Sequence, residues 1–393
     1  MEKEPLSYLK LFEFIKEHGN ESLLIFLEDY KHLEEKDLLN LFLFENNDLL
    51  KEIYKLTDQG DRKLGLRYDL TVPFAKFIAL NKNNISFPFK RYEIAKVFRD
   101  GPVKVGRDRE FTQCDADVVG ISGELVEAEL LSLYITAFKR LDIDIIIKYN
   151  NRNLMRGLIS EVGIEESKIS SVITIIDKMN KITEAELIKY LVDLGIEETK
   201  VNSLLAMFKM DLESIKSKFE NSNNEVLKTG IMEIDCLSNY IEKLGYNENC
   251  VLDLTLARGQ DYYTGNVFEV YDKSGVVTSS IGGGGRYDKM VGKFTGNDVP
   301  ACGFSIGFER IILLLLESGF KIPGQAAKKA YLIEKGYPAD KLQEVIAQAQ
   351  KERSEGTQVL VVRMNKNKKF QKEQLNKEGY EEFVEFYKEE LKR

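Results

Sequence analysis

The chain has 393 residues, of which 43% are hydrophobic and 31% charged; this composition is typical of a folded globular protein with room for about two or three domains. Its formal net charge of -8 excludes a global basic field, so any contact with nucleic acid must be local. The four cysteines form no C-x-x-C pair and there are only two histidines, which argues against a structural zinc site, a disulfide scaffold and a catalytic histidine.

The amino-terminal stretch MEKEPLSYLK has no apolar signal region, and the longest apolar run, IILLLL, is too short to span a bilayer. We therefore expect a cytoplasmic protein. Over residues 1 to about 60, Leu, Glu and Lys recur at helical spacing, which predicts helices there.

From Leu64 to Gly120, strand-like and helix-like pieces alternate around the turn-forming stretch NNISFPF. The pattern then changes. From about residue 152 to 245 the apolar residues repeat at i, i+3 and i+4 without strand alternation, and Gly163 and Gly195 stand where helices would end. This pattern predicts a helical insertion, residues 152–245, within a strand-rich domain.

Strand character returns at CVLDLTLA, continues through residues 256–271 and SGVVTSSI, and persists to the glycine run 282–285. An apolar helix follows over GFERIILLLLESG, with Gly319 as its C-cap. After a linker, the tail is predicted to be β-α-β-α, closing with a charged helix. The sequence thus predicts an α+β fold with a catalytic domain over residues 1–320 that contains the insertion, and a small α/β domain over residues 327–393.

The stretch LARGQDYYTGNVFEVY, residues 256–271, is unusually polar for a strand in a packed sheet. It carries Arg258, Asp261, Tyr262 and Tyr263, where a core strand would carry Val and Ile. Simple alternation would place Arg258 and Tyr262 on one face and Asp261 and Tyr263 on the other, although the glycines in the stretch allow it to bend.

A predicted hairpin over residues 90–120 carries Arg99, Arg107 and Arg109 around its loop. Arginine on a strand is a fixed fork for phosphate oxygens, whereas a loop arginine can fold over a nucleotide. The return strand places Gln113, Asp115 and Asp117 on one face, which is either a solvent face or the floor of a pocket. The structural alternative for the whole segment is a charged hairpin that is exposed to solvent and binds no ligand.

Three further features have both a functional and a structural interpretation. The glycine run in GGGGRYDKMVGKF allows close approach of a ligand or marks a tight turn; neither a P-loop nor a dinucleotide fingerprint is present. Arg310, at the head of an apolar helix, needs a ligand or an ion-pair partner. In LGLRYDLTVPFAKF, Arg67, Asp69 and Thr71 share one face if the chain is extended there, and would hold a small polar ligand.

Taken together, these segments resemble a known family. Residues 90–120 resemble motif 2 of the class II aminoacyl-tRNA synthetases, and ACGFSIGFERI resembles their motif 3. The stretches LRYDLTVPFAKF, YNNRNLMRGLI, LARGQDYYTGNVFE and GGGGRYD resemble signatures of the histidyl-tRNA synthetases, in that family's order, from about residue 50 to 320. The resemblance implies an antiparallel class II sheet flanked by helices, followed by a shortened domain similar to the anticodon-binding domain.

The resemblance also implies an activity and a site. The protein would activate L-histidine with ATP, accompanied by Mg²⁺, and transfer it from histidyl-adenylate to tRNA(His) as a homodimer. By similarity, the ATP-binding residues would be Arg99, Arg107 and Arg310, the histidine-binding residues Asp69, Thr71, Gln113, Asp117, Arg258, Tyr262 and Tyr263, and the catalytic residues Arg258 and Arg99. No resident metal site is implied.

The chain departs from the family pattern at three places. Motif 2 of the family usually has a glutamate two residues after its arginine, whereas here Arg99 is followed by Asp100 and Gly101. Residues 10–50 lack the proline of motif 1, and only 67 residues, 327–393, form the tail. That tail has 15 Lys and Arg against 12 Asp and Glu, a net charge of +3. Its lysines (Lys366, Lys368, Lys369, Lys372 and Lys377) form either a phosphate-contacting edge or a solvated helix face.

Two other functions remain open at this point. One is a non-charging paralogue that acts as the regulatory subunit of ATP phosphoribosyltransferase, which would suit the short tail. Such paralogues typically lose the arginine that Arg258 represents here. The other is a sensor of uncharged tRNA, which would need no intact ATP site. The presence of Arg99, Arg258 and Arg310 favours the synthetase.

Overall fold

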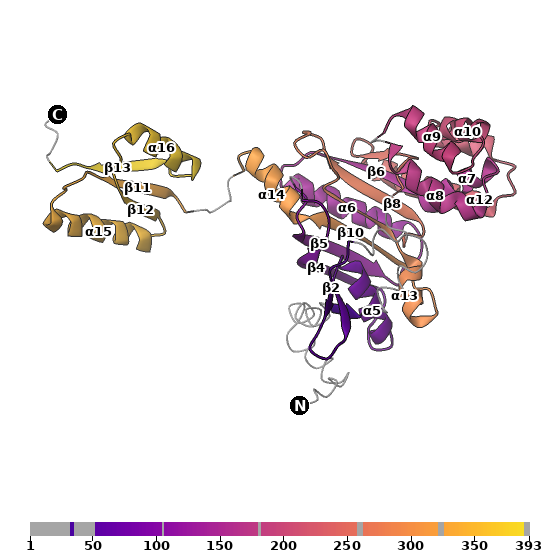
Figure 1. Cartoon of the computed structure of the whole chain (residues 1–393), viewed down its shortest axis with the longest axis horizontal. Coiled ribbons are helices and arrows are strands. Elements are labelled where there is room, and N and C mark those ends of the chain that lie inside the picture. The colour runs from indigo at the N-terminus through magenta and orange to yellow at the C-terminus, as the bar shows by residue number, and fades with distance from the viewer. Residues whose placement is uncertain are drawn as a thin grey trace. The chain divides into compact units, whose positions relative to one another are not determined.

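The computed structural model describes residues 32–34, 52–103, 106–179, 182–257, 262–320 and 326–388. The chain divides into two compact units, Met1–Ser318 and Gly319–Arg393 (Figure 1). Among the described residues, no helix is long and apolar enough to cross a membrane.

Within the described part of the first unit, seven strands form the main sheet (Figure 1). In spatial order these are β4 (Phe89–Phe98), β5 (Glu110–Val119), β10 (Ala301–Gly307), β9 (Gly282–Arg286), β8 (Asn266–Asp272), β6 (Ile145–Asn151) and β7 (Cys250–Leu252). Neighbouring strands are antiparallel, except that β6 and β7 are parallel. The predicted hairpin of β4 and β5 is confirmed, with Phe98 paired with Glu110 at its loop end.

One face of this sheet is apolar. Helix α6 (Leu125–Arg140) packs its buried Tyr134 against Phe304 of β10 and Phe268 of β8, with ring centroids 4.0 and 6.0 Å apart. Helix α14 (Phe308–Glu317) adds buried leucine and isoleucine side chains to the same cluster. Burial of these apolar side chains holds the helices against this face of the sheet.

The glycine run forms the strand β9 itself and not a tight turn. A Cβ at Gly282 would lie 2.8 Å from the Tyr134 hydroxyl, and a Cβ at Gly284 would lie 2.1 Å from the carbonyl oxygen of Gly303. Only glycine permits this approach of the strand to its neighbours. The tight-turn interpretation of the run is therefore wrong, and close approach to a ligand stays a prediction.

The other face of the sheet is polar, and α5 (Thr71–Asn81) and α13 (Asp288–Thr295) cover one end of it. Phe74 of α5 lies under the buried guanidinium of Arg91 on β4, whose carbon is 3.8 Å from the ring centroid. Tyr287, which immediately precedes α13, is also fully buried in this layer. This face carries the candidate site.

Several sequence-based expectations for the first unit are wrong. The described parts of residues 1–60 include the strands β1 (His32–Glu34) and β2 (Lys55–Thr57), which pair with β3 (Lys63–Leu66); the rest of the expected helices, like motif 1, lie outside the described residues. Strand β3 ends at Leu66, so Asp69 and Thr71 do not share an extended strand, because the backbone turns there into α5.

The predicted strand over residues 256–271 is also shorter than expected. Strand β8 begins only at Asn266, and Leu256, Ala257, Tyr262 and Tyr263 lie in irregular backbone before it. The stretch SGVVTSSI forms a loop and not a strand, because Asp272 accepts hydrogen bonds from the backbone N–H groups of Ser274 and Val276. Such local acceptors compete with ladder pairing.

Residues 152–243 are helical throughout most of their described length. The helices are α7 (Arg152–Glu161), α8 (Glu166–Ile176), α9 (Glu184–Asp193), α10 (Glu198–Phe208), α11 (Leu212–Lys218) and α12 (Glu225–Lys243). Helices α7 and α12 cross closely at two glycines: a Cβ at Gly157 would lie 2.5 Å from Leu227 Cα, and one at Gly230 would lie 2.0 Å from the Leu154 nitrogen.

The second unit is a three-stranded parallel sheet, counted over its described residues, in the order β12-β11-β13. Its elements are β11 (Lys328–Ile333), α15 (Ala339–Ser354), β12 (Gln358–Arg363), α16 (Lys368–Lys377) and β13 (Glu382–Phe386). Helix α15 packs on one face and α16 on the other. The expected β-α-β-α order is therefore incomplete, because β13 follows the last helix and pairs with β11.

Candidate active site

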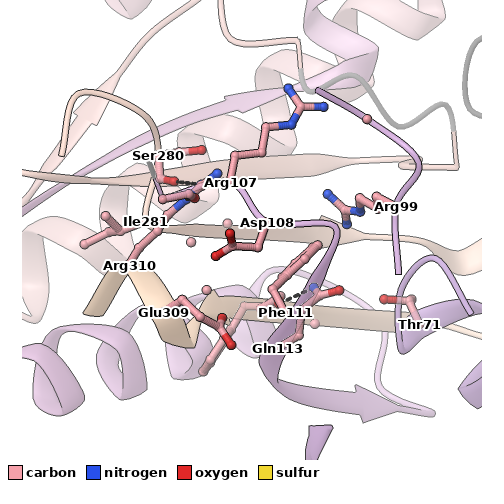
Figure 2. Close-up of a pocket in the computed structure, with 18 of the residues that line it drawn as sticks. Thr71, Arg99, Arg107, Asp108, Phe111, Gln113, Ser280, Ile281, Glu309 and Arg310 are labelled. Atoms are coloured by element: carbon pink, nitrogen blue, oxygen red, sulfur yellow. Dashed lines mark hydrogen bonds between the residues drawn. The ribbon is translucent and has the colours of Figure 1, made fainter. Parts of the chain in front are cut away.

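A cavity of about 310 Å³ opens on the polar face of the sheet, and Figure 2 shows the side chains around it. Its walls come from the β4–β5 hairpin, the glycine strand β9, strand β10 and the heads of α5 and α14. Of the residues nominated from the sequence, its lining includes Thr71, Arg99, Arg107, Gln113, Tyr263 and Arg310. Segments up to about 240 residues apart in the chain thus meet at one site, as expected from the resemblance.

Three arginines form the cationic end of the cavity: Arg99, Arg107 and Arg310. Arg310 is fixed by two backbone acceptors, since its Nε donates to the Gly106 carbonyl oxygen at 2.8 Å and its Nη1 donates to that of Ser280. Burial lowers the pKa of Arg310, and the charges of Arg99 and Arg107 lower it further. Three cations that repel one another around a cavity form a site for a polyanion.

Arg107 and Arg99 are linked through Glu52. The Arg107 Nη2 lies 3.2 Å from Glu52 Oε1, and the Tyr68 hydroxyl lies 3.4 Å from Glu52 Oε2. The Tyr68 ring in turn lies under the guanidinium of Arg99, whose carbon is 4.1 Å from the ring centroid. In Figure 2 the Arg107 guanidinium points away from those of Arg99 and Arg310, in keeping with its ion pair to Glu52.

Another part of the cavity is backed by an acidic floor, which we define as Asp69, Asp115 and Asp117. All three side chains are buried behind lining residues such as Gln113 and Tyr287. Burial raises the pKa of each of these carboxyl groups. The solvent-face alternative for the β5 residues is therefore wrong.

Asp117 has both oxygens in use. Its Oδ2 accepts from Arg91 at 3.0 Å, and its Oδ1 accepts from the Tyr287 hydroxyl at 2.6 Å. Arg91 also pairs with Glu93 and donates to the Leu70 carbonyl oxygen at 3.0 Å. Asp117 therefore reaches the cavity through Tyr287 and does not line it directly.

Asp115 lies across the strands from Glu93 and from Ser305 of β10. Its Oδ1 is buried and has no hydrogen-bond partner among the described residues. Burial, followed by the charge of Asp117, raises the pKa of Asp115 well above its ordinary value. A cationic ligand group in the neighbouring cavity would relieve this accumulation of buried negative charge.

The two tyrosines of the polar stretch lie in the same part of the site. Tyr263 lines the cavity, and the Tyr262 hydroxyl lies 3.4 Å from Asp69 Oδ2, while the two ring centroids are 4.7 Å apart. Asp69 Oδ1 accepts from the Val72 N–H at 3.0 Å and so joins the floor to the first turn of α5. Arg258 and Asp261, nominated from the same stretch, lie outside the described residues.

Other lining residues escaped the sequence analysis. These are Tyr287, Ser305, Phe111, Asp108 and Glu309, with Glu52 immediately behind Arg107. Tyr287 had a signal in the stretch GGGGRYD, and Ser305 and Glu309 had one in GFSIGFERI. Phe111 and Glu52 had none, because an isolated Phe or Glu has too many other uses.

Comparison with known proteins assigns the chain to a family. A family model described as histidyl-tRNA synthetase matches residues 34–311. Histidine--tRNA ligase 1 of Bacillus cereus (strain ATCC 10987 / NRS 248) is 45% identical over 275 residues, which are 68% of this chain and 62% of that protein. Histidine--tRNA ligase 2 of Shouchella clausii is 38% identical over 335 residues, 84% of this chain and 77% of that protein.

Solved structures agree with the fold. The histidyl-tRNA synthetase from Nostoc sp. PCC 7120 is 27% identical with a TM-score of 0.66, covering 95% of this chain and 86% of that one. An ATP phosphoribosyltransferase regulatory subunit/histidyl-tRNA synthetase from Bacillus halodurans C shares the fold at 20% identity and a TM-score of 0.67, covering 98% and 96%. The predicted α+β class II architecture is thereby confirmed. The chain spans 62% to 64% of the Bacillus relatives that it matches at 44–45% identity, and it belongs to the histidyl-tRNA synthetase family.

Proposed function

We propose that this protein activates L-histidine with ATP to histidyl-adenylate and then transfers the histidyl group to tRNA(His). The observation that carries the proposal is the presence of both charges at one cavity, which is lined by three arginines and backed by an acidic floor of three buried carboxyl groups. An amino acid and ATP that react carboxylate to α-phosphate need this arrangement, since the ammonium group and the polyphosphate lie at opposite ends of the reacting pair.

The roles follow from the placement of the residues. Arg99, Arg107 and Arg310 bind the phosphates; Thr71, Gln113 and the acidic floor residues Asp69 and Asp117 hold the histidine; Tyr262 and Tyr263 form the wall beside its imidazole; and Arg258 and Arg99 stabilise charge during adenylate formation. The presence of Thr71, Arg99, Arg107, Gln113, Tyr263 and Arg310 in the lining of one cavity supports their roles. Asp69, Asp117 and Tyr262 lie behind this lining: Asp117 bonds to the lining Tyr287, and Asp69 contacts the Tyr262 hydroxyl. Arg258 lies outside the described residues. Relatives named histidine--tRNA ligase support the same assignment.

Mg²⁺ would accompany ATP in this reaction. Magnesium binds through one or two carboxylates together with substrate phosphates. The lining carries the carboxylates of Asp108 and Glu309, and Glu309 Oε2 is buried without a hydrogen-bond partner among the described residues. The described chain holds no group of three or more acidic, histidine or cysteine side chains that could bind a metal, which suits an ion held largely by the nucleotide.

We also propose that residues 327–393 contact tRNA(His) and that the protein works as a homodimer. The net charge of +3 in this segment supports the RNA contact. Lys368 and Lys372 are already paired with Glu385, so the contact would depend more on Lys366, Lys369 and Lys377. Deleting residues 327–393 should leave ATP–pyrophosphate exchange intact and weaken tRNA charging; equal loss of both activities would contradict an RNA-binding role.

The test of the synthetase function is histidine-dependent ATP–pyrophosphate exchange with a pair of arginine variants. Arg310→Gln removes a phosphate-binding charge at the cationic end and should raise KM for ATP about 10-fold or more, as expected for a charge-assisted hydrogen bond of ~1.5–3 kcal/mol. Arg140→Gln is the matched control, because Arg140 is an exposed residue in the last turn of α6 and does not line the cavity. Absence of exchange in the wild type, with histidine bound, would refute the activity.

A further inference from the structure

Residues 150–152, at the junction between β6 and α7, form hydrogen bonds to a separate segment of irregular backbone, residues 254–257. This segment leads toward the cavity, and we call it the approach segment. The junction belongs to the stretch YNNRNLMRGLI, for which the proposed function gives no role. Its residues Asn150 and Arg152 are buried, with 1% and 7% of their surface exposed, and neither lines the cavity.

Asn150 uses its side-chain amide to hold two carbonyl groups. Its Nδ2 donates to the carbonyl oxygens of Leu254 at 3.0 Å and Leu256 at 2.9 Å. Two donors on one nitrogen thus fix the backbone on both sides of Thr255. Buried carbonyl groups of an irregular segment have no ladder partners, so a side chain must satisfy them.

Arg152 continues this clamp. Its Nη1 donates to the carbonyl oxygen of Ala257 at 3.0 Å, and its backbone N–H donates to that of Gly265 at 3.0 Å. One residue therefore bonds to both sides of the stretch that carries Tyr262 and Tyr263. A buried guanidinium that donates to backbone carbonyls is a rigid anchor, because its planar fork has few rotamers that keep the bond.

The approach segment contacts the cavity wall directly. Leu256 packs in a buried cluster with Tyr263 and Val267, and Tyr263 lines the cavity. On its other side the Tyr263 ring meets the glycine strand, since a Cβ at Gly285 would lie 2.8 Å from its Cδ1. The ring is therefore confined between Leu256 and β9, and a shift of Leu256 would move it.

We propose that Asn150 and Arg152 are positioning residues for the amino-acid end of the cavity: by holding the backbone of residues 254–257, they set the position of the Tyr263 wall. The inference rests on the proposed function, in which this wall lies beside the histidine. It predicts that damage at the junction raises KM for histidine and leaves KM for ATP unchanged, because the cationic end is built from other elements.

Two variants test the proposal in the full-length protein by ATP–pyrophosphate exchange. Asn150→Ala should lower kcat/KM for histidine on the order of 10-fold to 100-fold, as expected when a binding group is displaced by about an ångström, with KM for ATP within about twofold. Arg152→Lys keeps a charged donor, so its kcat/KM for histidine should fall less than that of Arg152→Ala. If Asn150→Ala does not fold, the two Arg152 variants give the answer.

Tyr149→Phe is the matched control. Tyr149 precedes the junction on β6, and its hydroxyl lies 3.0 Å from Ser238 Oγ in the helical region, away from the approach segment. The Tyr149→Phe change should lower thermal stability without changing KM for histidine or KM for ATP. The proposal would be overturned if Asn150→Ala raised KM for histidine and KM for ATP equally, or if Tyr149→Phe lowered kcat/KM for histidine. Either result would show a merely structural role.

A crystal structure of Asn150→Ala separates the inference from the proposed function. The inference predicts that the approach segment and the Tyr263 ring are displaced relative to the wild type, whatever the wild-type activity. Superposition of both within coordinate error would overturn it. If the wild type shows no exchange but the ring is displaced, the activity is refuted and the positioning role stands.

Discussion

Replacing Asp115 by asparagine should make the protein more stable and a poorer binder of its amino-acid substrate. Asp115 is 4% exposed, and its Oδ1 has no hydrogen-bond partner among the described residues. Burial and the charge of Asp117 raise its pKa well above the ordinary value of 3.8. Asparagine keeps the shape of the side chain, can still accept a hydrogen bond, and removes the buried charge.

The expected gain follows from removing a charge that burial disfavours. Each unit by which the pKa is raised corresponds to about 1.4 kcal/mol, so Asp115→Asn should raise the free energy of unfolding at pH 8 by ~1 kcal/mol or more. The sign depends on pH. Because the folded-state pKa of Asp115 is raised, the native protein binds more protons than the unfolded chain between pH 3.8 and that raised value, so wild-type stability falls as pH rises through this window. The variant's advantage should be largest at pH 8 and vanish as pH falls toward 3.8.

Urea unfolding of the wild type and Asp115→Asn across this pH range measures the difference. KM for histidine in ATP–pyrophosphate exchange should rise in the variant, because the floor loses a negative charge that favours the ammonium group. A stabilising substitution that weakens substrate binding marks a site strained for function. A variant less stable than the wild type at pH 8, or a difference that does not change with pH, would refute the reasoning.

Two further predictions concern ion pairs. In the wild type the Arg286 Nη2 lies 2.6 Å from Glu127 Oε2, and Arg286→Met would leave Glu127 as a buried charge without a partner guanidinium. In a urea titration this change should lower the free energy of unfolding by ~3–5 kcal/mol. The control is Lys90→Gln, which removes an exposed ion pair with Glu129 and should change the free energy of unfolding by less than ~0.5 kcal/mol. Glu52 pairs with Arg107 and would compete with the ATP phosphates for it. Because half-exposed ion pairs stabilise by ~0.2–1 kcal/mol, Glu52→Gln should lower KM for ATP by up to about fivefold. A raised KM for ATP would contradict this competition.

The hairpin and its polar face could be predicted from the sequence because both follow from local patterns. Strands β4 and β5 flank a short loop, and the period of two places Gln113, Asp115 and Asp117 on one side. Each candidate arginine could also be nominated alone. That Arg99, Arg107 and Arg310 share one cavity depends on β10 lying beside β5, a pairing across almost 200 residues that no local pattern encodes.

The failures have the same origin in non-local contacts. The stretch before Asn266 lies between apolar runs that favour a strand, but the side chains of Asn150 and Arg152 donate to its carbonyl groups and hold it in an irregular path. Strand β13 lies in a highly charged stretch and exists because β11 offers it an edge. Glu52 carries no local signal, since its role depends on Arg107, 55 residues away.

The central claim is that the cavity joins histidine to ATP. The most direct measurement is a rapid-quench assay of the full-length protein with Mg²⁺, labelled ATP and each amino acid in turn. If the cavity joins histidine to ATP, enzyme-bound aminoacyl-adenylate should form with histidine and should not exceed background with the other amino acids. A folded protein that binds histidine, shown by calorimetry, and forms no adenylate would contradict the claim and point to a non-charging relative.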